Sequence, residues 1–242
     1  MKVTYLNHSG FLVELEHMVL LFDYYMGKLP DWPKDKALFV FASHSHPDHF
    51  NWRILRLADS YPRIHYFFGN DIRLGRKWLE EKNIDVSVKE KITKMAGGQR
   101  QVYEDGNARI QVRTLKSTDI GVAFLLEAEG KRIYHAGDLN WWHWEGEPEQ
   151  DNREMEAAFK KEIDSISGEH FDLAFVPLDP RLEDSFALGL NYFLEKTDSP
   201  LVFPMHLWGK YETIAKYKRT AEGMKYAGRV ADVAKGGETW NI

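Results

Sequence analysis

Short apolar runs separated by turn residues dominate the first part of the chain. The run "ALFVFAS" at 37–43 is apolar at nearly every position, which is typical of a central strand buried on both faces. The shorter runs before it carry β-favouring residues and tight-turn signals such as Gly10. We therefore expect strands at 2–6, 10–16, 18–23 and 37–43.

Helical and β patterns alternate through the rest of the chain. Helical spacing is expected at 51–60, 70–83, 152–166, 184–196 and 211–228, and strands at 63–69, 171–179 and 201–206. Asp105-Gly106 and Glu129-Gly130 predict hairpins within 100–115 and 121–138. Two successive mixed blocks predict an α/β fold of two mixed sheets packed face to face with helices outside, a four-layer αββα sandwich. No linker or repeat divides it, so we expect one domain, 1–242.

Charge and composition narrow the choice of partner. The 242 residues carry a net charge of −5 with interspersed signs, so we expect neither nucleic acid nor a membrane surface as a partner. No stretch reaches the length of a membrane span, and the first residues do not resemble a signal peptide, so the expected location is the cytoplasm. The sequence leaves the oligomeric state open. It contains no cysteine, so any metal must be bound by His, Asp or Glu.

The segment "HSHPDH" at 44–49 directly follows the central apolar run. It places His44, His46, Asp48 and His49 within six positions, and imidazole nitrogens and carboxylate oxygens are usual ligands of borderline divalent ions. Sheets of this class bind ligands beyond the carboxyl ends of their strands. The alternative is a polar surface loop, but composition and position both favour a metal site.

Five segments together resemble the metallo-β-lactamase superfamily, in particular its lactonase-like, cytoplasmic H-x-H-x-D-H hydrolases. They are "TYLNHSGFLVE", "LFDYY", "HSHPDH", "IYHAGDLN" and "FPMHLWG". The resemblance implies that His44 and His46 bind one metal ion and that Asp48 and His49 bind a second. It further implies that Asp138 bridges both ions and that His206 completes the second site. Turn-forming or structural roles are the alternatives for Asp138 and His206.

One expected ligand is absent. The family normally supplies a third histidine to the first metal at the turn before the strand that reads "GVAFLLE", but no histidine lies between His65 and His135. Thr118 and Asp119 occupy about that place. Asp119 is chemically the better ligand, and whether either binds metal is left open.

Three further polar residues are considered beside the proposed ligands. The resemblance places His8 at the metal pocket, where it could protonate a leaving group, although a structural role is equally possible. Asp23 resembles a carboxylate that accepts a hydrogen bond from a ligating histidine, with a plain turn residue as the alternative. His135 lies within a predicted strand, and we expect it to be structural.

Candidate substrate contacts come from two other segments. Trp141, Trp142 and Trp144 follow Asp138 and could form a wall for a ring-bearing substrate, Trp141 being the named candidate, although packing is the commoner role of such clusters. Arg181 could bind a carboxylate or phosphate, with a surface ion pair as the alternative.

These expectations converge on metal-assisted hydrolysis of a small-molecule ester, lactone or phosphodiester. A metal-bound hydroxide would be the nucleophile, oriented by Asp48, and one or two divalent ions would be required, with zinc favoured and manganese or iron open. A metal sensor or degenerate non-hydrolytic relative is the main alternative because of the absent histidine. A nuclease is less favoured, since the chain lacks a basic clamp.

Overall fold

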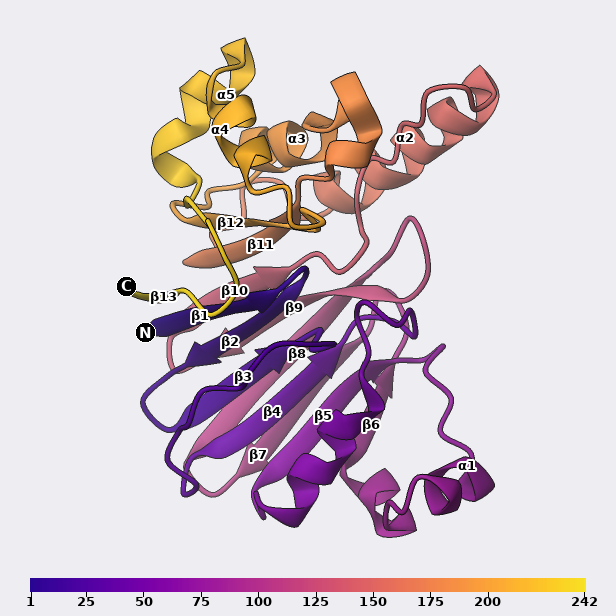
Figure 1. Ribbon diagram of the computed structural model, residues 1–242, viewed down its shortest axis with the longest axis vertical. Helices are drawn as coiled ribbons and strands as arrows, with labels where there is room; N and C mark the ends of the chain where they lie inside the picture. The colour runs from indigo at the N-terminus through magenta and orange to yellow at the C-terminus, as the bar shows by residue number, and fades with distance from the viewer.

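The computed structural model, which describes residues 1–242, contains two mixed β-sheets that lie face to face (Figure 1). In the first sheet the strand order is β13-β1-β2-β3-β4-β5-β6. Its members are β1 (Lys2–Asn7), β2 (Gly10–Glu14), β3 (Met18–Phe22), β4 (Ala37–Ala42), β5 (Ile64–Gly69), β6 (Ile92–Met95) and β13 (Thr239–Asn241). Every residue of β4 is buried, and β4 runs parallel to β3 and β5. The expected central strand is thereby confirmed.

The second sheet has the order β12-β11-β10-β9-β8-β7. Its strands are β7 (Arg100–Asp105), β8 (Ala108–Lys116), β9 (Val122–Ala128), β10 (Lys131–His135), β11 (Leu173–Pro177) and β12 (Val202–Met205). The β7–β8 and β9–β10 pairs are antiparallel, which confirms both expected hairpins, whereas β10, β11 and β12 are parallel. The carboxyl ends of these three parallel strands therefore lie along one edge of the sheet.

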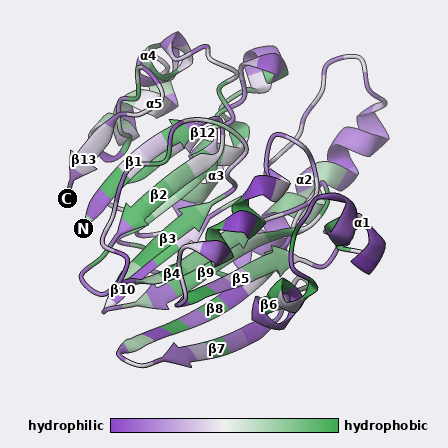
Figure 2. Ribbon diagram, turned by 60° about the horizontal axis from the view of Figure 1, so that its bottom comes forward, coloured by the Kyte–Doolittle hydropathy of each residue, from purple (hydrophilic) through white to green (hydrophobic).

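Helical segments cover the outer faces of both sheets (Figure 1). The second sheet carries α2 (Glu149–Asp164), α3 (Leu188–Lys196), α4 (Glu212–Lys218) and α5 (Ala221–Tyr226), and the first carries α1 (Arg76–Glu81) with 3₁₀ segments at Trp52–Asp59 and Val86–Lys91. Figure 2 shows β2 and β3 as mainly hydrophobic and α1 as mainly hydrophilic. The arrangement is the αββα sandwich that the sequence predicts. No helix combines the length and apolarity that crossing a bilayer requires.

Aromatic side chains fill the space between the sheets. Phe41 stacks on Phe22 and Phe67, with ring centroids 4.9 and 5.3 Å apart, and Phe175 of the second sheet lies 4.1 Å from Phe11 of the first. All five rings are buried and belong to one core of 51 buried residues that both sheets share. A core of this extent stabilises the strands whose ends carry the polar site.

The helical expectations needed several corrections. Trp52–Asp59 is 3₁₀ rather than α, with i→i+3 bonds at its ends: Ile54 N donates to Asn51 O and Ser60 N donates to Leu57 O, each at 3.0 Å. The helix expected at 70–83 is limited to α1, since the preceding backbone bonds to the strand ends, with Asn70 N donating to Met95 O. The helix expected at 211–228 divides where the Thr220 hydroxyl caps α5 by accepting from Gly223 N at 3.0 Å.

Strand β13 was not expected from the sequence. Only three residues long, it pairs antiparallel with β1, and the two chain ends lie side by side (Figure 1). The terminal ammonium of Met1 donates to Ile242 O at 3.0 Å. A strand this short leaves almost no periodic signal, so its pairing with β1 decides its conformation.

Candidate metal centre

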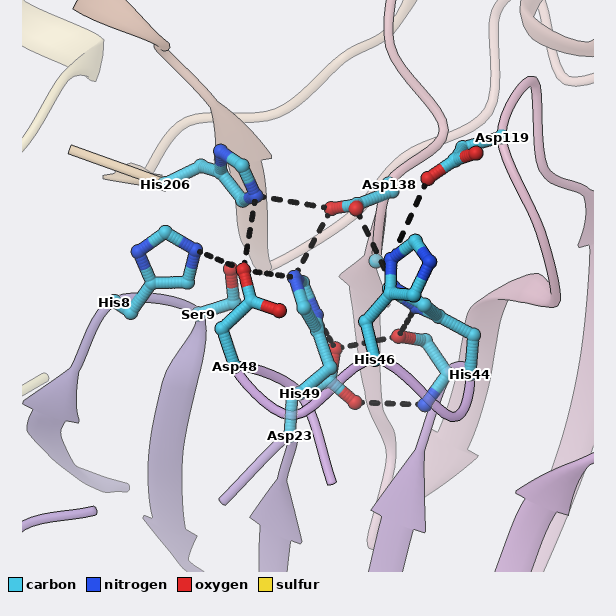
Figure 3. A network of polar contacts seen from close by, with 12 residues as sticks. His8, Ser9, Asp23, His44, His46, Asp48, His49, Asp119, Asp138 and His206 are labelled. Atoms are coloured by element: carbon cyan, nitrogen blue, oxygen red, sulfur yellow. Dashed lines mark hydrogen bonds and ion pairs between the residues drawn. The ribbon is translucent and has the colours of Figure 1, made fainter. Parts of the chain in front are cut away.

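Polar residues gather where strands of both sheets end. The loop after β4 supplies the histidines of the "HSHPDH" segment, Asp138 follows β10, and His206 follows β12. The turn between β1 and β2 adds His8 (Figure 3). Strands β10, β11 and β12 are parallel, and their carboxyl ends lie close to the carboxyl end of β4. Residues that are distant in sequence therefore meet at one place.

A first group contains His44, His46, Asp119 and Asp138, each offering a ligand atom within 4.8 Å of the others. His44 Nε2 lies 3.4 Å from Asp138 Oδ2 and 3.0 Å from His46 Nδ1. Asp119 Oδ2 lies 3.6 Å from His46 Nδ1. The structure therefore places the Asp119 carboxylate beside His46, within this first group.

A second group contains His8, Asp48, His49 and His206, with the same spread of ligand atoms. Asp138 adjoins this group as well, because its Oδ1 lies 3.2 Å from His49 Nε2 and 3.4 Å from His206 Nε2. The two oxygens of Asp138 thus face different groups. Figure 3 shows this carboxylate between His206 and His49 on one side and the His44–His46 pair on the other.

The donor set fits divalent metal ions. Nε2 of His8, His49 and His206 and Oδ1 of Asp138 are all buried, and none of them makes a hydrogen bond. Burying several polar atoms without partners is costly, and such atoms are normally satisfied. Their convergence on one small volume is explained by cations, which imidazole and carboxylate ligands bind together.

Three of the buried imidazoles, those of His44, His49 and His206, are oriented by a partner on the other nitrogen. His49 Nδ1 lies 2.7 Å from Asp23 Oδ2, and His206 Nδ1 lies 2.7 Å from Asp179 Oδ2. His44 Nδ1 lies 2.9 Å from the Ser43 hydroxyl, which itself donates to Asp23 at 2.6 Å. A proton held on Nδ1 leaves Nε2 free to bind a metal. The structure places Asp23 where a ligand-orienting carboxylate was expected.

Sequence reasoning missed Asp179 and Ser43. Asp179 follows β11 and is fully buried, and it also receives bonds from Arg181 Nε at 2.9 and 3.0 Å. The sequence feature that could have identified Asp179 is its place at the end of a predicted strand, two residues before Arg181. A serine preceding the first histidine offers no such signal, because its role depends on Asp23, twenty residues away.

The buried carboxylates of the site favour positive charge beside them. Burial alone would raise the pKa of Asp138, but His49, His206 and His44 hold it well below the usual range of a carboxyl group. Burial likewise opposes ionisation of Asp179, yet hydrogen bonds from His206 and Arg181 lower its pKa to about 2. Burial lowers the pKa of His49, but Asp138 and Asp23 outweigh it and raise that pKa well above its usual value. Buried carboxylates therefore favour positive charge at this place, and a metal ion can supply it.

Two glycines let the β4 loop approach the second sheet. A Cβ at Gly121 would lie 2.1 Å from Ser43 O, and one at Gly137 would lie 2.6 Å from Ser43 Cβ. Both residues also have positive φ, at 77° and 53°. Only glycine meets both demands without strain, so these positions bring His44 and Asp138 together.

Three other residues singled out from the sequence, Thr118, His135 and Trp141, have structural contacts. Thr118 lies at the pocket, but its hydroxyl donates to Asn140 O at 2.6 Å and so ties two loops together. His135 is buried, with Nε2 donating to Ser9 O at 2.9 Å, in keeping with the structural role expected for it. Trp141 does not line the pocket; its ring packs near Phe159 with centroids 6.3 Å apart.

A cavity of about 360 Å³ opens over the metal centre. Trp142, Trp144 and Trp208 form its apolar wall together with Met155, and Arg181 also lines it. Trp208 was not expected from the sequence, and its exposed fraction of 46% is large for an indole. The volume suits a small molecule whose reacting group lies at the metal residues.

Comparison with known proteins identifies the family of the chain. A family model for the beta-lactamase superfamily domain matches residues 2–151. The chain belongs to the β-lactamase superfamily. Two curated relatives are described as UPF0173 metal-dependent hydrolases. The protein from Opitutus terrae is 30% identical over 147 residues, and that from Alkaliphilus metalliredigens is 26% identical over 151. Each match covers 57% of this chain and 63% of the relative, so less than two thirds of those proteins is represented.

Two solved structures share the fold along nearly the whole chain. Igni18, a metallo hydrolase from Ignicoccus hospitalis, matches with a TM-score of 0.59 and 16% identity, covering 100% of this chain and 98% of that one. The metallo-β-lactamase fold protein YhfI from Bacillus subtilis matches with a TM-score of 0.59 and 15% identity, covering 99% and 98%. At these identities the likeness establishes the metallo-β-lactamase fold of this superfamily member and nothing about its substrate.

Proposed function

We propose that this superfamily member is a metal-dependent hydrolase that acts on a small-molecule ester, lactone or phosphodiester. The observation that carries the proposal is the pair of ligand groups, joined by Asp138, on the floor of the 360 Å³ cavity. The description of its relatives as metal-dependent hydrolases supports it. We propose one or two divalent ions as cofactors, with zinc favoured and manganese or iron as alternatives. A cytoplasmic location remains a proposal, supported by the resemblance described from the sequence.

The residues would divide the chemistry among them. Divalent ions in such a site supply activation of water and polarisation of the scissile carbonyl or phosphoryl oxygen. His44, His46, Asp119 and Asp138 would hold one ion, and Asp48, His49 and His206 the other. Asp48 lines the cavity, so its carboxylate can orient the attacking water and accept its proton. Asp23 and Asp179 hold the rings of His49 and His206 in the tautomer that presents Nε2.

Substrate binding would fall to the cavity wall. Trp142, Trp144 and Trp208 present indole surface to an apolar part of the substrate and exclude water from the reaction. Arg181 uses Nε and Nη2 to bond Asp179, and its guanidinium lies 4.5 Å from the centre of the Trp208 ring. Its Nη1 makes no hydrogen bond within the chain, so it can contact a carboxylate or phosphate of the substrate.

A substrate panel with metal analysis tests the proposal. The purified chain would be loaded with Zn²⁺, Mn²⁺ or Fe²⁺, its metal content counted, and its turnover measured on simple esters, lactones and phosphodiesters. We expect turnover on one class that disappears on chelation and returns with metal. Bound metal without turnover on any class would contradict hydrolysis and favour the metal-sensor alternative.

Asp119 is proposed to replace the absent third histidine of the first metal. The Asp119→Ala substitution should weaken binding of one ion by about 10-fold or more and leave the other in place, since the His8, Asp48, His49 and His206 group is untouched. Metal counted during stepwise dialysis against a chelator measures this. The parent should release its two ions over a narrower range of chelator concentration than the variant.

Asp119 carries no alternative role that would mimic this result. Its side chain is 42% exposed, and its one ion-pair contact within the chain is with His46. Release of both ions together from the variant and the parent at the same chelator concentration would show that Asp119 does not bind metal.

A further inference from the structure

His8 is the member of the metal centre whose role the sequence left between a proton donor and a structural residue. It lies in the turn between β1 and β2, and its backbone has a positive φ of 54°. Positive φ is uncommon for residues other than glycine and often marks a functional position. The His8 carbonyl accepts a hydrogen bond from His206 N at 3.3 Å, which ties this turn to the end of β12.

The imidazole of His8 points its Nε2 at the second ligand group. Nε2 lies 3.2 Å from Asp48 Oδ2 and is among the buried atoms without a hydrogen bond. One ligand atom from each of His8, Asp48, His49 and His206 lies within 4.8 Å of the others. Ligands about 2.1 Å from one ion lie up to about 4.2 Å apart, so small side-chain rotations would let all four bind the same ion.

The ring of His8 is fixed in this orientation by its neighbours. Its centroid lies 4.1 Å from that of His206, 4.6 Å from Trp208 and 6.0 Å from Tyr25. Only 3% of its surface is exposed, so rotation away from the site would require these rings to move. An imidazole held in this orientation with a free Nε2 can bind an ion without a large change of conformation.

The expected role as a proton donor fits this geometry poorly. A donor to the leaving group must reach the substrate cavity, and the cavity is lined by Asp48, His206 and Trp208 but not by His8. His206 and Trp208 pack against the ring of His8 and line the cavity themselves. His8 therefore borders the second ligand group and does not line the cavity.

We propose that His8 is a ligand of the second metal, which would then have three imidazole ligands, from His8, His49 and His206, together with Asp48. Asp138 would contribute its Oδ1 beside them. The inference rests on the proposed metal centre but not on any particular substrate. It gives the second site more neutral imidazole ligands than the first, which has two histidines and two aspartates.

Two substitutions separate ligation from a positioning role. His8→Asn tolerates the positive φ but is too short to reach the ion, whereas His8→Gln can reach Asp48 with an amide donor yet is a poor metal ligand. A ligand role predicts that both variants bind one ion at least 10-fold more weakly than the parent in a zinc competition titration against a chelator. If His8 only orients Asp48, His8→Gln keeps the parental affinity, and the proposal is overturned.

A buried histidine outside the site provides the matched control. His65 is 6% exposed, and its Nε2 bonds the Thr93 hydroxyl at 2.8 Å. His65→Gln should bind both ions as the parent does, provided circular dichroism shows that it is folded. Equal weakening in His65→Gln would attribute the loss to general destabilisation and overturn the proposal.

Nitrogen NMR of the parent chain gives a direct readout that needs no variant to fold. With ¹⁵N-labelled histidine and metal-free protein, addition of Zn²⁺ should shift the Nε2 resonances of His8, His49 and His206 and leave that of His65 in place. An unshifted His8 Nε2 at full zinc occupancy would overturn the proposal. Absence of turnover on the substrate panel would contradict the proposed hydrolysis alone, because these measurements use no substrate.

Discussion

The Asp138→Asn substitution is expected to reduce turnover on the order of 10³-fold or more and to lower the bound metal toward zero. The two carboxylate oxygens face different ligand groups, with Oδ2 3.4 Å from His44 Nε2 and Oδ1 3.2 Å from His49 Nε2. An amide keeps the shape but removes the charge and replaces one acceptor with a donor. Both ions therefore lose a ligand at once. Metal content and turnover, measured on the same sample, check this.

A carboxylate far from the site is the control for the substitution itself. Asp172 accepts from Lys131 Nζ at 3.0 Å and from Arg132 N at 2.8 Å, at the start of β11 rather than its end. Asp172→Asn should keep parental metal content and turnover. Asp138→Asn with two bound ions would show that Asp138 only shapes the turn after β10.

His49→Ala is expected to abolish measurable turnover, by about 10³-fold or more, and to remove the second ion while the chain remains folded. The ring lies between two buried carboxylates, with Nδ1 2.7 Å from Asp23 and Nε2 3.2 Å from Asp138. Its removal takes away a ligand and also the partner of Asp23. The substitution leaves the core of 51 buried hydrophobic residues unchanged, so circular dichroism should show the parental secondary structure.

The Asp23→Asn variant tests whether the loss in His49→Ala comes from the missing ligand itself. Asp23→Asn leaves the His49 ring in place but weakens the bond that fixes its tautomer, so metal affinity should fall only by about 10- to 100-fold. His65→Ala removes a buried imidazole outside the site and should retain the metal. Turnover in His49→Ala within a few-fold of the parent would remove His49 from the proposed machinery.

The sequence alone determined the strands that position the site. Period-two and continuous apolar runs, with Gly-containing turns, are local signals, and they predicted the hairpins and the central strand β4. The close spacing of His44, His46, Asp48 and His49 likewise indicates metal binding without reference to any distant residue. Asp138 and His206 required more than this, because each is a single residue at a strand end whose meaning came from resemblance.

Tertiary structure decided which distant residues meet at the centre. Asp179 orients His206 across 27 positions of sequence, and Asp119 reaches His46 across 73, so no local pattern could relate them. The residues of the cavity wall could not be predicted from local sequence either. Trp141 packs beside α2, whereas Trp208 lines the cavity. An indole's environment depends on which elements pack against it, and hydropathy along the chain does not carry that information.

The sequence therefore determined the framework and one half of the site, because strand periodicity, turns and the "HSHPDH" spacing are encoded by neighbouring residues. The other half was decided when β4 and β10 to β12 brought their carboxyl ends together. Gly121 and Gly137 permit that approach, since a Cβ at either would collide with Ser43. The same packing placed the Nε2 of His8 beside Asp48, His49 and His206, where burial without a hydrogen-bond partner gives it the character of a ligand.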